Sequence, residues 1–300
     1  MRFAKGHGTG NDFLILDDPD GALALSPELV ARLCDRHTGL GADGILRIVR
    51  ADRAAEGADG AAGPAAEWFM DYRNADGSVA EMCGNGVRVF ARYLIGHGLA
   101  EGPELAIATR AGLRRVREEA DGSITVDMGT PVIGGRSSAL IGSQTCQGLE
   151  VSLGNPHLAC LVDLPVAELD LSAPPVIDRR RFPEGANVEV ARVLGDRRLE
   201  MRVYERGSGV TLSCGTGAVA AAVAAAAAGT GAAAAAGTGA DASAAPAGTW
   251  AVRVPGGDLV VTLTGSASLL TGPAVIVAEG VVDEAWLARP VFATPGHQAR

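Results

Sequence analysis

Two cysteines of this chain stand in matching surroundings. Cys83-Gly84-Asn85-Gly86 and Cys214-Gly215-Thr216-Gly217 share the pattern Cys-Gly-x-Gly, and each leads into a run that favours a helix. At a helix N-terminus, unpaired backbone N–H groups and the positive end of the helix dipole stabilise a thiolate. The sequence therefore predicts two activated thiols, each with its pKa drawn toward neutrality.

A pair of such thiols suits the inversion of a carbon centre next to a carboxylate. One thiolate removes the proton from one face while a thiol returns a proton to the other, which requires an acid and a base on opposite sides. Two converging helix N-termini would also offer N–H groups to the carboxylate, and their glycines allow the backbone close approach. A lone cysteine before a glycine is more often structural, but the doubled motif favours function. Core packing is expected for Cys34 and Cys160.

The remaining composition argues for a reaction without a cofactor or a metal. Lys5 is the only lysine, so a pyridoxal-phosphate enzyme would have a single candidate for its Schiff base. The chain has 5 cysteines and no Cys-x-x-Cys pair, which fits neither a disulfide framework nor a zinc site.

Charge and hydropathy exclude further classes of protein. The net charge is -9 and the arginines are scattered, which argues against a nucleic-acid partner. Residues 215–248 carry no charge except Asp241, but alanine is too weakly apolar for a membrane span, and we expect a buried helix to about Ala228 followed by a loop. The N-terminal residues lack an apolar signal-peptide core, so we expect a cytoplasmic protein.

The chain is long enough for two domains, and its second half repeats the first. In the first half, a helix with Ser26 as N-cap is predicted to run to about His37, residues 51–65 are a surface insertion, and strands are predicted at 13–18, 45–49, 68–72, 105–109, 113–117 and 123–128. In the second, one strand is predicted to end at Asp163 and others to span 188–193 and 199–204, with a hairpin at 251–260. Gly10-Asn11 matches Gly154-Asn155, and we pair Arg73-Asn74 with Ala186-Asn187. The repeat predicts two α+β domains related by a pseudo-twofold axis.

Several polar residues accompany the two thiols. Asparagines recur in turn-forming stretches of both halves, at positions 11, 74, 155 and 187. Ordinary turn chemistry would explain each one, but their recurrence favours amides lining a cleft. His157 is either a residue that contacts or orients the ligand or a structural loop histidine. Glu205 and Arg206 suit an ammonium and a carboxylate, which together indicate an amino-acid ligand.

Motifs spread over most of the chain resemble those of the diaminopimelate epimerase family. They are Lys5-Gly6-His7-Gly8-Thr9-Gly10-Asn11-Asp12-Phe13, Asn74-Ala75-Asp76-Gly77-Ser78 through Cys83-Gly84-Asn85-Gly86, Gly154-Asn155-Pro156-His157, and Glu205-Arg206-Gly207-Ser208-Gly209 through Cys214-Gly215-Thr216-Gly217. The resemblance implies an isomerase that interconverts LL- and meso-2,6-diaminopimelate without cofactor or metal, in lysine and peptidoglycan precursor biosynthesis. It also implies a homodimer.

The same resemblance assigns the fold and the site. Each domain is expected to be a mostly antiparallel sheet or barrel around a central helix, one domain at 1–128 plus 276–300 and the other at 129–275. The C-terminal strand is expected to return to the first domain. Cys83 and Cys214 are implied as the proton-transfer residues. Substrate binding is implied for Asn11, Asn74, Gly84, Asn85, Asn155, His157, Asn187, Glu205, Arg206, Gly215 and Thr216.

Two departures from the family and three alternatives accompany this prediction. Many members carry a ligand-contacting glutamine where this chain has Gly44, and the Ala/Gly-rich stretch 229–248 is longer than the fold needs. A proline or hydroxyproline racemase would share the paired cysteines. A thiol hydrolase or transferase using Cys214 with His157 would leave Cys83 idle, and a non-catalytic amino-acid-binding module would leave both thiols idle.

Overall fold

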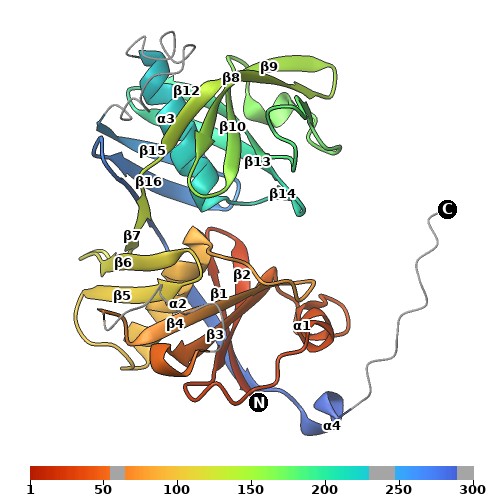
Figure 1. Ribbon diagram of the computed structural model, residues 1–300, viewed down its shortest axis with the longest axis vertical. Helices are drawn as coiled ribbons and strands as arrows, with labels where there is room; N and C mark the ends of the chain where they lie inside the picture. The colour runs from red at the N-terminus through yellow and green to blue at the C-terminus, as the bar shows by residue number, and fades with distance from the viewer. Residues whose placement is uncertain (55–64, 230–246, 289–300) are drawn as a thin grey trace, which may run out of the picture.

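The computed structural model describes residues 1–54, 65–229 and 247–288 of the chain. Its two halves lie one above the other along the long axis, and in each of them β-strands surround one long helix (Figure 1). The prediction of a two-domain α+β fold is confirmed.

The first half contains the N-terminal strands, a short outer helix and the helix that follows Cys83. A 3₁₀ turn, η1 (Ala51–Arg53), ends the third strand. The elements are β1 (Arg2–Gly8), β2 (Asn11–Asp17), α1 (Pro27–Cys34), β3 (Gly44–Arg50), β4 (Trp68–Asn74), α2 (Gly84–Gly96), β5 (Glu104–Thr109), β6 (Gly112–Glu118) and β7 (Ile124–Gly129).

The second half is built in the same way around the helix that follows Cys214. A 3₁₀ turn, η3 (Val166–Glu168), lies within it. The elements are β8 (Val132–Ile141), β9 (Gln144–Ser152), β10 (Pro156–Leu161), β11 (Val176–Ile177), β12 (Asn187–Gly195), β13 (Arg198–Glu205), β14 (Gly209–Thr211), α3 (Gly215–Gly229), β15 (Gly248–Val254), β16 (Gly257–Leu263) and β17 (Ser268–Gly272). The last strand is β18 (Val275–Val281), followed by α4 (Glu284–Leu287).

The internal repeat is visible in the strand pairing. In the first half β2 is parallel to β3, β3 antiparallel to β4, and β4 parallel to β5, after which β5, β6 and β7 form an antiparallel meander. The second half has the same sequence of pairings in β10, β12, β13, β15, β16 and β17. The register makes Phe13 equivalent to His157, and Gly44 equivalent to Asn187.

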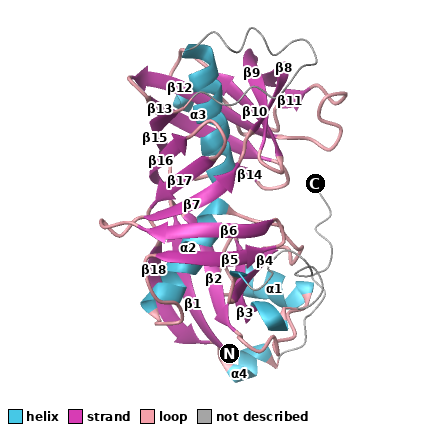
Figure 2. Cartoon of the chain, turned by 60° about the vertical axis from the view of Figure 1, so that its left-hand side comes forward, coloured by secondary structure: helices cyan, strands magenta, loops and turns pink. Residues whose placement is uncertain are grey.

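Strand exchange joins the two halves. β7 pairs with β17 between the lobes (Figure 2), and β18 runs back to pair with β1 of the first half. The residues at which one domain ends and the other begins, 128/129 and 275/276, stay a prediction, and residues 289–300 of the first predicted domain lie outside the described part.

The central helices are buried for a reason that their sequences show. α3 carries no charged residue, and each of its residues from Gly215 to Ala227 is buried. A helix that is apolar on every side must be surrounded, and strands β9, β10, β12 and β16 pack around it. None of the described helices is long and apolar enough to cross a membrane.

Some sequence predictions of elements were wrong. The helix α1 ends at Cys34 and not at His37, because Asp35 turns away and its carboxylate accepts hydrogen bonds from the backbone N–H groups of His37 and Thr38. β1, β8 and β9 were not predicted, since their glycines and polar residues hide the alternation of a strand.

The pairing of Asn74 with Asn187 was also wrong. Asn187 begins β12, which is equivalent to β3, whereas Asn74 ends β4, which is equivalent to β13 ending at Glu205. The two Asn-bearing turns were paired because their short motifs look alike. In the repeat they are one strand apart, since Asn187 corresponds to the start of β3 and Asn74 stands at the end of β4. Most of the predicted insertion at 51–65 and of the 229–248 loop lies in the parts of the chain that the structure does not describe.

Candidate active site

The N-termini of α2 and α3 meet end to end at the junction of the two halves. Cys83 is the N-cap of α2, and its Sγ accepts a hydrogen bond from the Gly86 N–H at 3.5 Å. Cys214 directly precedes α3. A Cβ added to Gly215 would lie 2.8 Å from Leu270 Cδ2 and 3.4 Å from the Gly84 Cα, so Gly215 lets the end of α3 pack against Leu270 while it lies beside the end of α2.

A cleft of about 730 Å³ opens over these helix ends. Both cysteines line it, together with the polar side chains and glycines that sequence reasoning singled out from both halves. The predicted site residues that line the cleft are Cys83, Cys214, Asn11, Asn74, Gly84, Asn85, Asn155, Asn187, Glu205, Arg206, Gly215 and Thr216. Their places agree with a shared site, while their individual roles stay predictions.

His157 is the predicted site residue that does not line the cleft. It lies in β10 and is fully buried. Its Nδ1 is 2.7 Å from Glu189 Oε1, and its Nε2 is 3.1 Å from Asn155 Oδ1. His157 therefore contacts Asn155, which does line the cleft.

Cys83 lies among neutral amides and one buried cation. Its Sγ is 3.5 Å from Asn11 Oδ1, to which the thiol donates, and Asn85 Nδ2 donates to the same oxygen at 3.2 Å. Arg88, one turn into α2, is fully buried and donates to Asn85 Oδ1 at 2.9 Å. Burial lowers the pKa of Arg88 to about 10, which still leaves it charged at neutral pH. No ion pair of the described residues involves Arg88.

Cys214 lies among acids instead. Burial raises the pKa of Cys214 well above its usual range, and the carboxylates of Glu205 and Glu189 raise it further. Burial also raises the pKa of Glu205, although hydrogen bonds with Thr211 and Cys214 oppose the shift. Thr216 Oγ1 lies 3.5 Å from Cys214 Sγ.

The prediction of thiol pKa values near neutrality was wrong for the unliganded protein. Burial, helped by the Glu205 carboxylate, raises the pKa of Cys83 to about 11, and the backbone N–H groups of Gly86 and Asn85 offset only part of that shift. Excluding water from the thiolate raises the pKa by more than the hydrogen bonds from two N–H groups lower it. Both thiols are therefore protonated in the free protein near neutral pH.

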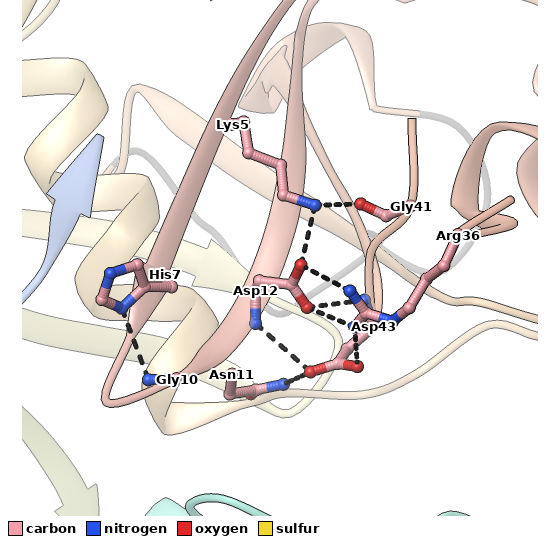
Figure 3. A network of polar contacts seen from close by, with 8 residues as sticks. All are labelled: Lys5, His7, Gly10, Asn11, Asp12, Arg36, Gly41 and Asp43. Carbon is pink, nitrogen blue, oxygen red and sulfur yellow. Dashed lines mark hydrogen bonds and ion pairs between the residues drawn. The ribbon is translucent and has the colours of Figure 1, made fainter. Parts of the chain in front are cut away.

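A polar network on the first half fixes the orientation of Asn11 (Figure 3). Asn11 Nδ2 donates to Asp43 Oδ2 at 2.8 Å, and Arg36 bridges Asp43 and Asp12 at 2.7 Å each. Lys5 adds an ion pair to Asp12 at 2.7 Å. Burial opposes ionisation of Asp12, but the hydrogen bonds from Arg36 and Lys5 outweigh it and lower its pKa to about 2.

Sequence reasoning missed four residues of this region. Arg88 and Glu189 were hidden inside apolar runs, where a lone charge is itself the signal of a buried partner. Tyr72 lines the cleft from β4, two residues before Asn74 and thus on the same face of the strand. Asp43 also lines it. At Gly44 a Cβ would lie 2.5 Å from Arg73 O and 2.9 Å from the Tyr72 ring, so Tyr72 needs a glycine there.

The described residues contain no cluster of His, Cys, Asp and Glu arranged to hold a metal ion. The buried cysteines outside the cleft, Cys34, Cys146 and Cys160, lie in hydrophobic clusters, which confirms core packing for Cys34 and Cys160.

Comparison with known proteins identifies relatives over nearly the whole chain. The family model described as diaminopimelate epimerase matches residues 3–134 and 150–277. A diaminopimelate epimerase of Thermobifida fusca is 57% identical over 287 residues, which covers 94% of this chain and 98% of the relative. A diaminopimelate epimerase of Mycolicibacterium smegmatis is 48% identical, covering 95% of this chain and 98% of its own.

Solved structures share the fold at much lower identity. A phenazine biosynthesis protein of the PhzF family from Bacillus anthracis aligns with a TM-score of 0.65 at 17% identity, covering 94% of this chain and 99% of its own. A hydroxyproline epimerase from Agrobacterium vitis, with bound trans-4-hydroxy-L-proline, aligns with a TM-score of 0.61 at 16% identity, covering 96% of this chain and 97% of its own.

Proposed function

The chain belongs to the diaminopimelate epimerase family, and from that membership we propose that Cys83 and Cys214 are the acid and base that invert the substrate's α-carbon. The activity is that of the family, an isomerase reaction that interconverts LL- and meso-2,6-diaminopimelate in lysine biosynthesis. The meeting of the two Cys-Gly-x-Gly helix ends in one cleft is the observation that carries the two-cysteine proposal.

The proton transfers follow from this arrangement. One cysteine, as thiolate, takes the α-proton, so that the C–H bond breaks and an S–H bond forms. The other thiol gives its proton to the opposite face, where a new C–H bond forms and its S–H bond breaks. The N–H groups at both helix ends stabilise the carboxylate as negative charge builds on it.

The surroundings of the thiols support one assignment of the first base. The Glu205 carboxylate opposes a thiolate at both cysteines, but Arg88 favours one at Cys83, whereas Glu189 adds to the opposition at Cys214. Binding a substrate ammonium beside Glu205 would offset that repulsion. We therefore assign the resting acid to Cys214 and the base to Cys83, whose thiol proton passes to solvent water before the thiolate takes the α-proton. In the reverse direction Cys214 is the base, and Glu205 is the neighbouring acceptor for its proton.

The geometry disfavours a hydrolase that would pair Cys214 with His157. Both ring nitrogens of His157 face oxygens of Glu189 and Asn155, and its side chain does not reach the cleft. The remaining proposals are a reaction without cofactor or metal, a small amino acid as the ligand, a homodimer, and a cytoplasmic location, which the 5 unpaired cysteines support.

The test measures, in heavy water, the incorporation of deuterium at the substrate's α-carbon and the stereoisomers that form. With LL-diaminopimelate and protein treated with chelator and freed of pyridoxal phosphate, Cys83→Ala and Cys214→Ala should each lower epimerisation at least about a thousandfold, since each removes an acid/base group. Cys146→Ala, a buried cysteine outside the cleft, serves as the matched control. Full epimerase activity in either cleft variant would refute the two-base mechanism.

A further inference from the structure

Asn11 and Asn155 occupy equivalent places in the two halves, yet their side-chain amides point in opposite senses. Asn11 turns its Oδ1 to the Cys83 side, where it is 3.2 Å from Asn85 Nδ2. Asn155 turns its Nδ2 to the Cys214 side, where it is 3.4 Å from Thr216 Oγ1. Asn85 and Thr216 are themselves equivalent, each two residues after its cysteine. One half thus offers an acceptor and the other a donor.

Different anchors hold the two amides. The Asn11 Nδ2 donates to the Asp43 carboxylate at 2.8 Å, which leaves its oxygen facing the cleft. The Asn155 Oδ1 faces His157 Nε2 at 3.1 Å, which leaves its amino group facing the cleft. A carbonyl oxygen only accepts, so His157 Nε2 must carry a proton to make this bond.

Glu189 supplies the reason that Nε2 is protonated. Its Oε1 lies 2.7 Å from the other ring nitrogen, Nδ1, and both side chains are fully buried. With oxygens facing both nitrogens, the ring satisfies both contacts when it is an imidazolium with Glu189 as counter-ion. The remaining oxygen, Oε2, has no hydrogen-bond partner among the described residues, so His157 is the partner that holds the carboxylate.

The backbone of α3 is built to admit this carboxylate. A Cβ at Gly217 would lie 2.7 Å from Glu189 Oε1. At the equivalent Gly86 of α2, a Cβ would meet Leu46 Cδ2 at 3.1 Å, since Leu46 stands where the second half has Glu189. Phe13 likewise stands in place of His157. The ion pair is therefore an addition to the repeated scaffold on one side only.

We propose that Glu189 is a positioning residue which, by keeping His157 protonated on Nε2, fixes Asn155 with its amino group toward the cleft as a hydrogen-bond donor to the substrate. A donor there suits a carboxylate, whereas a flipped amide would present an oxygen and repel it. The inference rests on the proposed function, because it takes the cleft to be the substrate site.

The first test uses the free enzyme and needs no activity. In protein labelled with ¹⁵N-histidine, the His157 signals, identified by their loss in His157→Gln, should show a proton on Nε2. The variant Glu189→Gln keeps the shape but removes the charge, and should make the ring neutral with both tautomers populated. A wild-type His157 with a bare Nε2 would overturn the proposal, whether or not the variants fold and whatever the substrate proves to be.

The second test is kinetic. Glu189→Gln should raise KM about fivefold and change kcat little, because Asn155 binds ground and transition states alike. In an Asn155→Ala background the same change should have less than about a twofold effect, as expected for residues that act through one another. Glu150→Gln, a carboxylate in β9 paired with Arg181 away from the cleft, is the matched control. An equal rise in KM with and without Asn155→Ala, or no rise in either background, would refute a role of Glu189 through Asn155.

Discussion

Around Cys83 the scaffold positions next to the helix end are apolar, whereas around Cys214 they are ionisable. Phe13 and Leu46 stand in the first half where His157 and Glu189 stand in the second. The fifth residue after the cysteine is Arg88 in α2 and Val219 in α3. The repeated backbone thus brings two alike thiols to one cleft, and the side chains beneath them give the thiols different proton affinities.

This difference is useful to a reaction that needs an acid and a base at once. Two identical thiols in identical surroundings would have the same pKa. In the state with one thiolate and one thiol, either cysteine would then be the thiolate equally often. The Glu205 carboxylate raises the pKa of both thiols, so the difference is fixed by Arg88 beside Cys83 and Glu189 beside Cys214. The following predictions would remove, reverse or measure the difference, in order of expected effect.

The largest expected effect comes from making the second half resemble the first. Glu189→Leu alone should lower the free energy of unfolding by about 3 kcal/mol, because the His157 ring loses its counter-ion and its buried Nδ1 is left without a hydrogen-bond partner. The double variant His157→Phe with Glu189→Leu should recover most of that loss, because packed apolar residues replace a buried ion pair at little cost. Urea unfolding measures both, and a double variant less stable than the single one would contradict the ion-pair assignment.

Removing the cation of the first half should cost activity. Arg88→Met should lower kcat/KM about a hundredfold, since the neighbouring thiolate loses the charge that favours it. Arg114→Met, which replaces a partly buried arginine of β6 outside the cleft, is the control. Thermal unfolding of both variants separates lost activity from lost fold, and wild-type activity in a folded Arg88→Met protein would remove Arg88 from the comparison.

The order in which the thiols react as the pH rises measures their difference directly. The pKa of Cys83 is raised to about 11 and that of Cys214 well above its usual range. Iodoacetamide should therefore label Cys83 about tenfold faster than Cys214 in mildly alkaline solution, since the thiolate is the nucleophile. Peptide mapping by mass spectrometry gives the two rates. Faster labelling of Cys214 would reverse the assignment of the resting acid.

The same shifts set the sign of one stability effect. Because the folded pKa of Cys83 lies above its unfolded value of 9.0, folding favours the thiol. The resulting stability is complete below about pH 9 and is lost as the pH rises toward 11. Cys83→Ala should weaken the alkaline loss of stability in urea unfolding, and an unchanged alkaline slope would argue against a buried thiol.

The smallest expected effect concerns Tyr72, whose equivalent in the second half is Val203. Its hydroxyl has no hydrogen-bond partner among the described residues, and its side chain lines the cleft. Tyr72→Phe should raise KM about threefold to fivefold, because it removes one hydrogen bond from the Tyr72 hydroxyl to the bound substrate. Tyr93→Phe, in α2 and outside the cleft lining, is the control. Equal KM values in the two variants would mean that Tyr72 only fills space beside Gly44.

The sequence by itself determined the repeat and the two helix starts, and every site residue it predicted except His157 lines the cleft. These features are local, since a Cys-Gly-x-Gly turn, an Asn-bearing turn and an apolar run each follow from neighbouring residues. It also indicated the fold class, because strands and helices recur in the same order in both halves.

Only the tertiary structure decided how each thiol is charged and which groups act through others. From the helix ends alone we predicted thiolates, but burial raises the thiol pKa values by more than the helix ends lower them. Burial depends on how the whole cleft is packed. The equivalence of Gly44 with Asn187, and the contact of Glu189 with His157, come from pairing between strands that lie 30 or more residues apart. Proton affinity depends on the distance of every nearby charge and on the exclusion of water, and the chain fixes both only when it folds.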